Sequence, residues 1–291
     1  MKSYNPTEFA FQTEWVEKRG LWLVMAFFLG GLGGGLYLVS LYLNYLPGIV
    51  TAFFIVAVGK GGTHLLYLGK PLRFWRAFLK PQTSWISRGI ISVAGFVLFV
   101  GLQLLPEVPG FSFLPWTMHS GLIQGLAIAS AVLLIAYTGF ALGVVNSIPF
   151  WNTALMPLLF IIYSLLGGTG LTLGLLLGTG NTVINIEVVE AVARWFLLTA
   201  IVIVGAYLWI SYHVNPVAKY SVFQLIKGRV SPYFIGGVLV LGLAVPVTVT
   251  ALELVYNLPY TVMLSGVACE LIGGFSLRYT ILKAGAYTPL V

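Results

Sequence analysis

Long apolar runs, separated by short polar segments, follow one another along the whole chain. Eight of them cover residues 21–46, 48–69, 86–105, 118–145, 153–177, 188–211, 233–254 and 260–282. Each is close to the ~20 residues that a helix needs to cross the hydrocarbon core of a bilayer. They are continuously apolar, without the alternation of a membrane barrel strand, so we predict helices, whose backbone groups pair within the segment.

The composition supports a chain that is surrounded by lipid. Hydrophobic residues make up 59% of the 291 residues and charged residues only 8%, whereas a soluble domain carries about 25% charged residues. We therefore predict an all-α integral membrane protein with eight transmembrane helices. We expect a polar N-terminal segment over 1–20. Because the first and fifth spans are both rich in glycine, we expect the spans to form two related four-helix bundles, 21–146 and 147–291.

The glycines and the single cysteine exclude several kinds of site. Gly170, Gly174 and Gly178 recur every four residues, which is typical of close helix contacts in lipid and not of a phosphate-binding loop after a strand. Cys269 alone cannot build a structural zinc site or hold an iron–sulfur cluster. We therefore predict no metal site and no iron–sulfur cluster in this protein.

The histidines argue against a haem. A b-type haem usually needs two facing histidines at one depth, but His119 is predicted on the opposite side from His64 and His213. His213 is predicted to lie in a loop. We therefore predict no bound haem. A haem-bearing cytochrome stays an alternative function, which an absorption spectrum would test.

The basic residues predict the orientation. With eight spans, both termini and the even-numbered loops share one side, and thirteen of the 15 Lys and Arg fall there. Only Arg194 falls on the other side, and Lys60 lies within a span. By the positive-inside rule we predict a multi-pass protein of the inner (cytoplasmic) membrane with both termini in the cytoplasm. The net charge of +7 thus reflects topology and not nucleic-acid binding; alternatively, the basic loops dock an acidic partner from either side.

A few ionisable residues lie at membrane depth, where they are costly and mark functional sites. Lys60 and His64 are one helical turn apart in the second span and share a face. Glu270 lies near the middle of the eighth span, with Arg278 two turns on. Glu270 could pair with Arg278 or Lys60 as structural support, or it could relay protons on a path with Glu253, Lys60 and Arg278; both interpretations stay open.

The inner half of the membrane gathers groups that suit a quinone headgroup. They are Lys60, His64, Ser87, Arg88 and Tyr137, with Arg278 as a further candidate. The two carbonyl oxygens of a quinone need hydrogen-bond donors, and its redox chemistry needs proton carriers such as histidine. Several of these residues also have an ordinary structural explanation: a helix end for His64, snorkelling for Lys60 and packing for Tyr137.

Two short motifs in and after the second span resemble a known family. Residues 64–73 read HLLYLGKPLR, and residues 84–89 read SWISRG. Together with the glycine-rich first span and the run Tyr137–Thr138–Gly139, they resemble the membrane-anchor subunits of the NrfD/polysulfide reductase family. The similarity to the anchors of dimethyl sulfoxide reductases is more distant.

The resemblance implies a subunit of a quinone-linked, molybdopterin-dependent oxidoreductase of a respiratory chain. Such a subunit docks a four-cluster iron–sulfur protein, which in turn docks a molybdopterin catalytic subunit. It exchanges electrons and protons with menaquinone or ubiquinone in the first four-helix bundle, where His64 and Tyr137 match positions implicated in the family. The docking surface would include the second loop, with Lys70, Arg73, Arg76 and Lys80.

The sequence departs from the related patterns at one position that matters for proton handling. In the dimethyl sulfoxide reductase type a glutamate follows the SW-SR run, but this protein has Gly89. Proton handling must then fall to His64, Lys60 or Glu17. The competing function is a proton- or ion-translocating module or transporter, which predicts broken helices at the midplane; apart from scattered glycines the sequence offers little sign of these.

Overall fold

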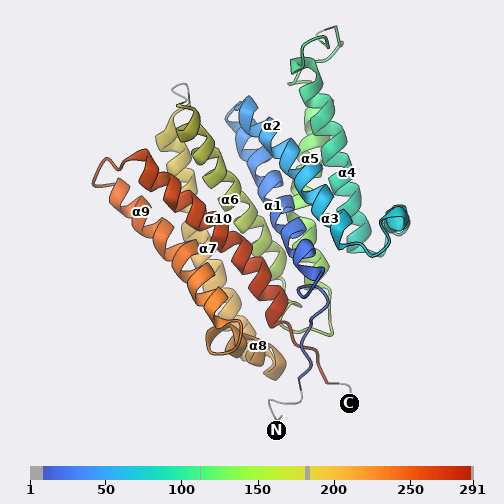
Figure 1. Ribbon diagram of the computed structural model, residues 1–291, viewed down its shortest axis with the longest axis vertical. Coiled ribbons are helices and arrows are strands. Elements are labelled where there is room, and N and C mark those ends of the chain that lie inside the picture. The colour runs from blue at the N-terminus through green and yellow to red at the C-terminus, as the bar shows by residue number, and fades with distance from the viewer. Residues whose placement is uncertain (1–8, 112, 181–183, 290–291) are drawn as a thin grey trace.

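The computed structural model describes residues 9–111, 113–180 and 184–289. Within these residues, eight spans are long and apolar enough to cross a membrane, and they stand side by side as one bundle (Figure 1). The spans in order along the sequence are α1 (Gly20–Tyr42); α2, η2 and α3 (Leu46–Phe54, Ile55–Lys60, Gly61–Tyr67); α4 with η4 (Trp85–Leu104, Leu105–Glu107); α5 (Gly121–Gly143); α6 (Leu155–Thr179); α7 (Ile186–Val214); η5 with α9 (Pro232–Ala244, Val245–Glu253); and α10 (Tyr260–Ala284). The predicted all-α membrane fold with eight spans is confirmed.

Within the described residues, two shorter helices lie outside the spans. The 3₁₀ helix η3 (Pro71–Phe78) follows α3, and α8 (Pro216–Ile226) follows α7. The side chain of Asn215 accepts a hydrogen bond from the backbone N–H of Val217 and begins α8. Because α7 therefore continues to Val214, the prediction that His213 lies in a loop is wrong: it lies in the last turn of α7, with Nδ1 2.8 Å from the carbonyl oxygen of Trp209.

Two of the spans are partly wound as π-helix. Segment η2 covers Ile55–Lys60 and segment η5 covers Pro232–Ala244, and each continues directly into an α-helix. The sequence pattern did not predict these segments. π-Helical turns are rare and frequently occur at functional sites, and η2 ends at Lys60, one of the predicted site residues.

Helix α1 lies in the middle of the bundle, between α6 on one side and the second span on the other (Figure 1). Glycines permit this close approach: a side chain at Gly35 would collide with the backbone of Ser164, and one at Gly168 with the backbone of Gly35. The buried apolar residues form two large clusters, and α1 contributes to both of them. The division into halves at 146/147 stays a prediction.

Both ends of the described sequence, α8 and η3 lie at one end of the bundle, which we call the terminal face (Figure 1). The terminal segments pair there, since Gln12 N–H donates to the carbonyl of Gly285 and Tyr287 N–H donates to that of Ala10. The opposite end is the distal face. One basic residue assigned to the terminal face from the sequence does not reach it, because the side chain of Arg278 is only 1% exposed and lies inside the bundle.

Candidate functional site

Lys60 and Tyr137 form a buried pair on one side of α1. The Nζ atom of Lys60 donates to the hydroxyl oxygen of Tyr137 at 2.8 Å and to the carbonyl oxygen of Ala26 at 3.1 Å. The side chain of Lys60 is 1% exposed and that of Tyr137 is 6% exposed. An ammonium group has three hydrogens to donate, so these two bonds leave one over. Among the described residues, Lys60 has no carboxylate within ion-pair distance.

Two glycines make room for this pair. A methyl group on Gly30 of α1 would lie 2.7 Å from the Nζ of Lys60, and one on Gly89 of α4 would overlap the ring of Tyr137. The ring of Phe27 packs edge-on against that of Tyr137, with centroids 6.5 Å apart. The lysine and tyrosine therefore occupy space that larger residues at either glycine would fill.

His64 lies one turn beyond Lys60, in α3. It is half-buried, and its Nδ1 has no hydrogen-bond partner among the described residues. Helix α3 is thinly covered: none of its residues is fully buried, and a methyl group on Gly62 would meet nothing within 4 Å in the described part of the sequence. His64 thus offers an unused ring nitrogen on a helix that borders the lipid.

A second polar cluster lies on the other side of α1, where α6 and α10 meet it. The guanidinium of Arg278 donates to the carbonyl oxygen of Gly274 at 2.8 Å and to the hydroxyl of Ser164 at 3.2 Å. Glu270 is 8% exposed. In the described residues, the Oε1 of Glu270, the Nε of Arg278 and the hydroxyl of Tyr163 are buried without a hydrogen-bond partner. The interpretation that Glu270 pairs with Arg278 or Lys60 therefore does not hold.

The two clusters contact adjacent glycines of α1, on different faces of the helix. A methyl group on Gly30 would meet Lys60, whereas one on Gly31 would lie 2.6 Å from the Nη2 of Arg278. Consecutive residues of a helix point about 100° apart, as 3.6 residues make one turn. The two buried cations thus lie at one level of the bundle, against different faces of α1.

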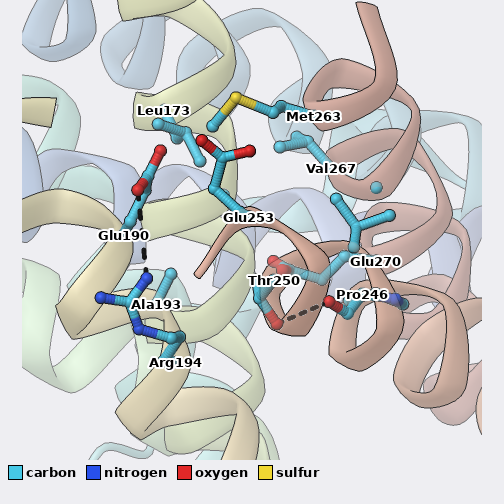
Figure 2. Close-up of a pocket in the computed structure, with 13 residues that line it drawn as sticks. Leu173, Glu190, Ala193, Arg194, Pro246, Thr250, Glu253, Met263, Val267 and Glu270 are labelled. Carbon is cyan, nitrogen blue, oxygen red and sulfur yellow. Dashed lines mark hydrogen bonds and ion pairs between the residues drawn. The ribbon is translucent and has the colours of Figure 1, made fainter. Parts of the chain in front are cut away.

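Glu270 borders a cavity that extends toward the distal face, between α7, α9 and α10. The carboxyl groups of Glu190 and Glu253 point into the same space from α7 and α9 (Figure 2). Glu190 forms an ion pair with Arg194 at 3.9 Å, and Glu253 accepts the backbone N–H of Leu258 at 3.1 Å. The cavity has a volume of about 40 Å³, which is room for a few waters at roughly 10–15 Å³ each.

Comparison with known proteins identifies the family. The family model described as "Polysulphide reductase, NrfD" matches residues 17–290. The protein belongs to the NrfD family. It is also 27% identical, over 291 aligned residues, to the C subunit of the polysulfide reductase of Wolinella succinogenes, with 89% of this protein and 91% of the relative covered. The resemblance seen in the second-span motifs is therefore confirmed, over nearly the whole sequence.

The remaining residues predicted for the site of this NrfD protein lie in different surroundings. Arg88 stacks on Trp85, with 4.4 Å from its Cζ to the ring centroid, and donates to the backbone carbonyls of Pro81 and Gln82. Its guanidinium thus holds the loop before α4. Ser87 is buried in the first turn of α4, and Glu17 is exposed before α1. The hydrogen bonds of the Lys60–Tyr137 pair within the described residues do not involve Arg88, Ser87 or Glu17.

The predicted docking residues of this NrfD protein surround η3, which projects from the bundle at the terminal face (cyan in Figure 1). Lys70, Arg73, Arg76 and Lys80 are all exposed there. Apolar side chains are exposed among them: Leu72 is 91% exposed and Trp75 is 52% exposed. The segment combines positive charge with uncovered apolar surface.

Sequence reasoning missed several residues of the second cluster and its cavity. Nothing in the sequence marks Glu190 and Arg194 as cavity residues, because charged residues near the end of a span usually reach water. Tyr163 and Ser164 resemble any polar residue in an apolar helix. The one available signal was Gly170, because a methyl group there would lie 2.5 Å from the Oε1 of Glu270; its glycine spacing was interpreted only as helix packing.

Proposed function

We propose that this NrfD protein is the membrane-anchor subunit of a reductase complex and exchanges electrons and protons between a quinone of the membrane and an iron–sulfur partner. Family membership and the similarity to the C subunit of polysulfide reductase support the membrane-anchor role. The single observation that supports quinone binding by this protein is the buried Lys60–Tyr137 pair, with a hydrogen bond of 2.8 Å.

The donors of this pair suit the carbonyl oxygens of a quinone. The hydroxyl of Tyr137 accepts from Lys60, and its own hydrogen has no acceptor in the part of the sequence described. An ammonium that shares its hydrogens with the tyrosine oxygen makes that hydroxyl a stronger donor. In apolar surroundings, a cation without a carboxylate also stabilises negative charge on a bound oxygen.

We assign quinone access to α3 and proton supply to His64, which lies in that helix. A quinone takes up two electrons and two protons at its carbonyl oxygens. The unused Nδ1 of His64 lies within one turn of Lys60, and an imidazole can take up and release a proton at a ring nitrogen. The thin cover of α3 suits a ligand that arrives through lipid. Menaquinone and ubiquinone both fit these requirements.

The basic segment around η3 is proposed as the docking surface. Lys70, Arg73, Arg76 and Lys80 would attract an acidic face of the partner, while Leu72 and Trp75 would be covered by it. The proposed partner is a four-cluster iron–sulfur protein that carries a molybdopterin catalytic subunit. It lies at the terminal face, because η3 lies there.

The experiment for the quinone site is the substitution His64→Ala in the assembled complex. We expect the complex to be recovered at the same yield and to lose electron exchange with a quinol analogue. The control is His213→Ala, which removes a histidine from the same face of the membrane but is exposed and far along the sequence. Unchanged quinol-linked turnover in His64→Ala would remove this residue from the site.

The side of docking is tested separately. The excess of basic residues at the terminal face supports a cytoplasmic location for both termini in the inner membrane. A reporter fused to the C-terminus and active only outside the cytoplasm is expected to stay silent, while one active only in the cytoplasm gives signal. The reverse pattern would place the iron–sulfur partner on the outer side.

A further inference from the structure

We propose that Glu270 is a proton-binding site that exchanges protons with the aqueous phase at the distal face, through the cavity bordered by Glu190 and Glu253. The proposal goes beyond quinone exchange and does not rest on it, since no residue of the Lys60–Tyr137 pair takes part. The transferred species is a proton alone: the carboxylate of Glu270 takes it from a water molecule or a neighbouring carboxyl group and returns it the same way.

The Glu270 carboxyl group lies deep in the bundle without a partner. It is ten residues into α10, or roughly 15 Å along the helix axis at about 1.5 Å per residue. It is 8% exposed, and within the described residues its Oε1 has no hydrogen-bond partner and no ion partner. A buried carboxylate that lacks a partner is costly in an apolar interior. Holding a proton removes that charge.

The fold leaves room for this group on α6. Gly170 of α6 faces the carboxyl, and a methyl group there would lie 2.5 Å from Oε1. One turn further along α6, a methyl group on Gly174 would make only ordinary contacts, at 3.6 Å from Val267. The fold therefore clears space at the carboxyl group itself.

The cavity extends from Glu270 toward the distal face. It is also lined by Glu190, Arg194, Thr250 and Glu253 (Figure 2). Glu190 lies in the first turns of α7 and Glu253 ends α9, so both lie near the distal face. The volume of about 40 Å³ admits a few waters, at roughly 10–15 Å³ each. Waters between carboxyl groups can pass a proton along hydrogen bonds.

On the side of Glu270 toward the terminal face, the neighbouring polar groups are Tyr163 and Arg278 and not carboxyl groups. A smaller cavity of about 10 Å³ is lined by Glu270, Tyr163 and Arg278. This is the space of one water at most. The titratable or charged groups that face Glu270 are thus Tyr163 from α6, Glu190 and Arg194 from α7, Glu253 from α9 and Arg278 from its own helix. Of these two sides, the one with Glu190 and Glu253 offers room for a chain of waters.

The composition of the cavity favours a proton over a metal cation. Among the described residues, no group of three or more histidine, cysteine or carboxylate side chains is placed to hold a metal ion. Hard cations such as calcium take six or more oxygen ligands. A single carboxyl oxygen without a hydrogen-bond partner is sufficient to bind a proton.

The test uses dicyclohexylcarbodiimide, an apolar reagent that forms a stable adduct with protonated carboxyl groups in apolar surroundings. The full complex in its membrane is treated, and the adduct is located by mass spectrometry. We expect an adduct on Glu270 that forms several-fold more slowly as the pH at the distal face is raised. Glu107, which is exposed near the end of the third span, serves as the control and should stay unlabelled.

Four variants sharpen this test. Glu270→Gln should lose the adduct completely, and Gly170→Ala should slow its formation several-fold, while Gly174→Ala should leave the rate unchanged. His64→Ala should also leave it unchanged, which separates this proposal from that of the quinone site. Labelling of Glu270→Gln equal to that of the parent overturns the proposal. Protection of Glu270 by sodium ions at constant pH also overturns it, because the site would then bind a metal cation and not a proton.

A second measurement does not depend on the carboxyl group of Glu270. In a Cys269→Ala background, Thr250→Cys places a thiol in the cavity and Leu252→Cys places one on the lipid side of the same helix. Thiols react as thiolates, which form in contact with water. A membrane-impermeant maleimide added at the distal face should modify Thr250→Cys and not Leu252→Cys. Equal reactivity of both, or reaction of Thr250→Cys only from the terminal face, overturns the proposal.

Discussion

Two buried cations lie at one level of this NrfD protein, against different faces of α1, and their surroundings differ. Lys60 ends the π-helical segment η2 beside the thinly covered α3, so its surroundings border lipid. Arg278 is enclosed by α1, α6 and α10, with the rings of Phe28 and Phe160 within 6 Å of its guanidinium carbon. Among the described residues neither cation has a carboxylate within ion-pair distance.

One helix can thus serve two kinds of chemistry. A site that borders lipid can receive an apolar carrier, whereas the enclosed site adjoins, at Glu270, a cavity that extends toward the distal face. Gly30 and Gly31 are adjacent in α1 and face one site each. Substitutions at α1 and at the two cations therefore test whether the sites are independent.

Gly35→Ala should disrupt both sites at once, with the largest effect of all. The added methyl group would collide with the backbone of Ser164, and backbone cannot move aside as a side chain does. We expect a loss of about 3 kcal/mol or more in stability, at the upper end for overpacked contacts, and a strongly reduced yield of folded protein. Gly205→Ala is the control, because a methyl group there would meet no described atom within 4 Å. Equal yields would show that α1 and α6 can separate without loss of the fold.

Lys60→Met should abolish quinol-linked turnover while the protein stays folded. The substitution removes the cost of burying the charge, but it also leaves the hydroxyl oxygen of Tyr137 and the carbonyl oxygen of Ala26 without their donor. We therefore expect the free energy of unfolding to fall by about 2–3 kcal/mol. Thermal unfolding in detergent and turnover with a quinol analogue measure the two effects. The exposed Lys227→Met should change neither. A stable variant with full turnover would contradict a role for the ammonium group.

The pair Gly30→Ala and Gly31→Ala should affect the two sites separately. The first methyl group meets the flexible end of Lys60 and should lower quinol-linked turnover several-fold, with unchanged carbodiimide labelling of Glu270. The second meets Arg278 and the hydroxyl of Ser164, and should change the labelling with little effect on turnover. Both quantities are measured on both variants, and parallel losses would mean that the two sites act as one.

Tyr137→Phe should have the smallest effect. It removes one hydroxyl and one charge-assisted hydrogen bond, and Lys60 keeps its bond to the carbonyl of Ala26. We expect a loss of about 2 kcal/mol in stability and a few-fold lower turnover. Tyr37→Phe removes the buried hydroxyl bonded to Gln103 and serves as the control, with a similar stability loss at full turnover.

The motifs of the second span led to the correct family, but they could not rank the site residues. Arg88 lies in the most specific motif, yet its guanidinium binds loop carbonyls and the ring of Trp85. Gly89 marks a departure from the dimethyl sulfoxide reductase pattern, and the structure supplies a reason, because the ring of Tyr137 fills the space above it. Contacts between distant segments decide both cases.

The sequence by itself determined the eight spans, their helical state and the family, because hydrophobic length and local motifs are properties of consecutive residues. It also singled out Lys60, Glu270 and Arg278, since charge at membrane depth is rare. Only the tertiary structure decided which of them share a site. Lys60 meets Tyr137 from 77 positions away, and Glu270 meets a cavity lined by α7 and α9. Such pairings depend on which helix faces turn toward each other, and the glycines that let α1 and α6 touch set those faces.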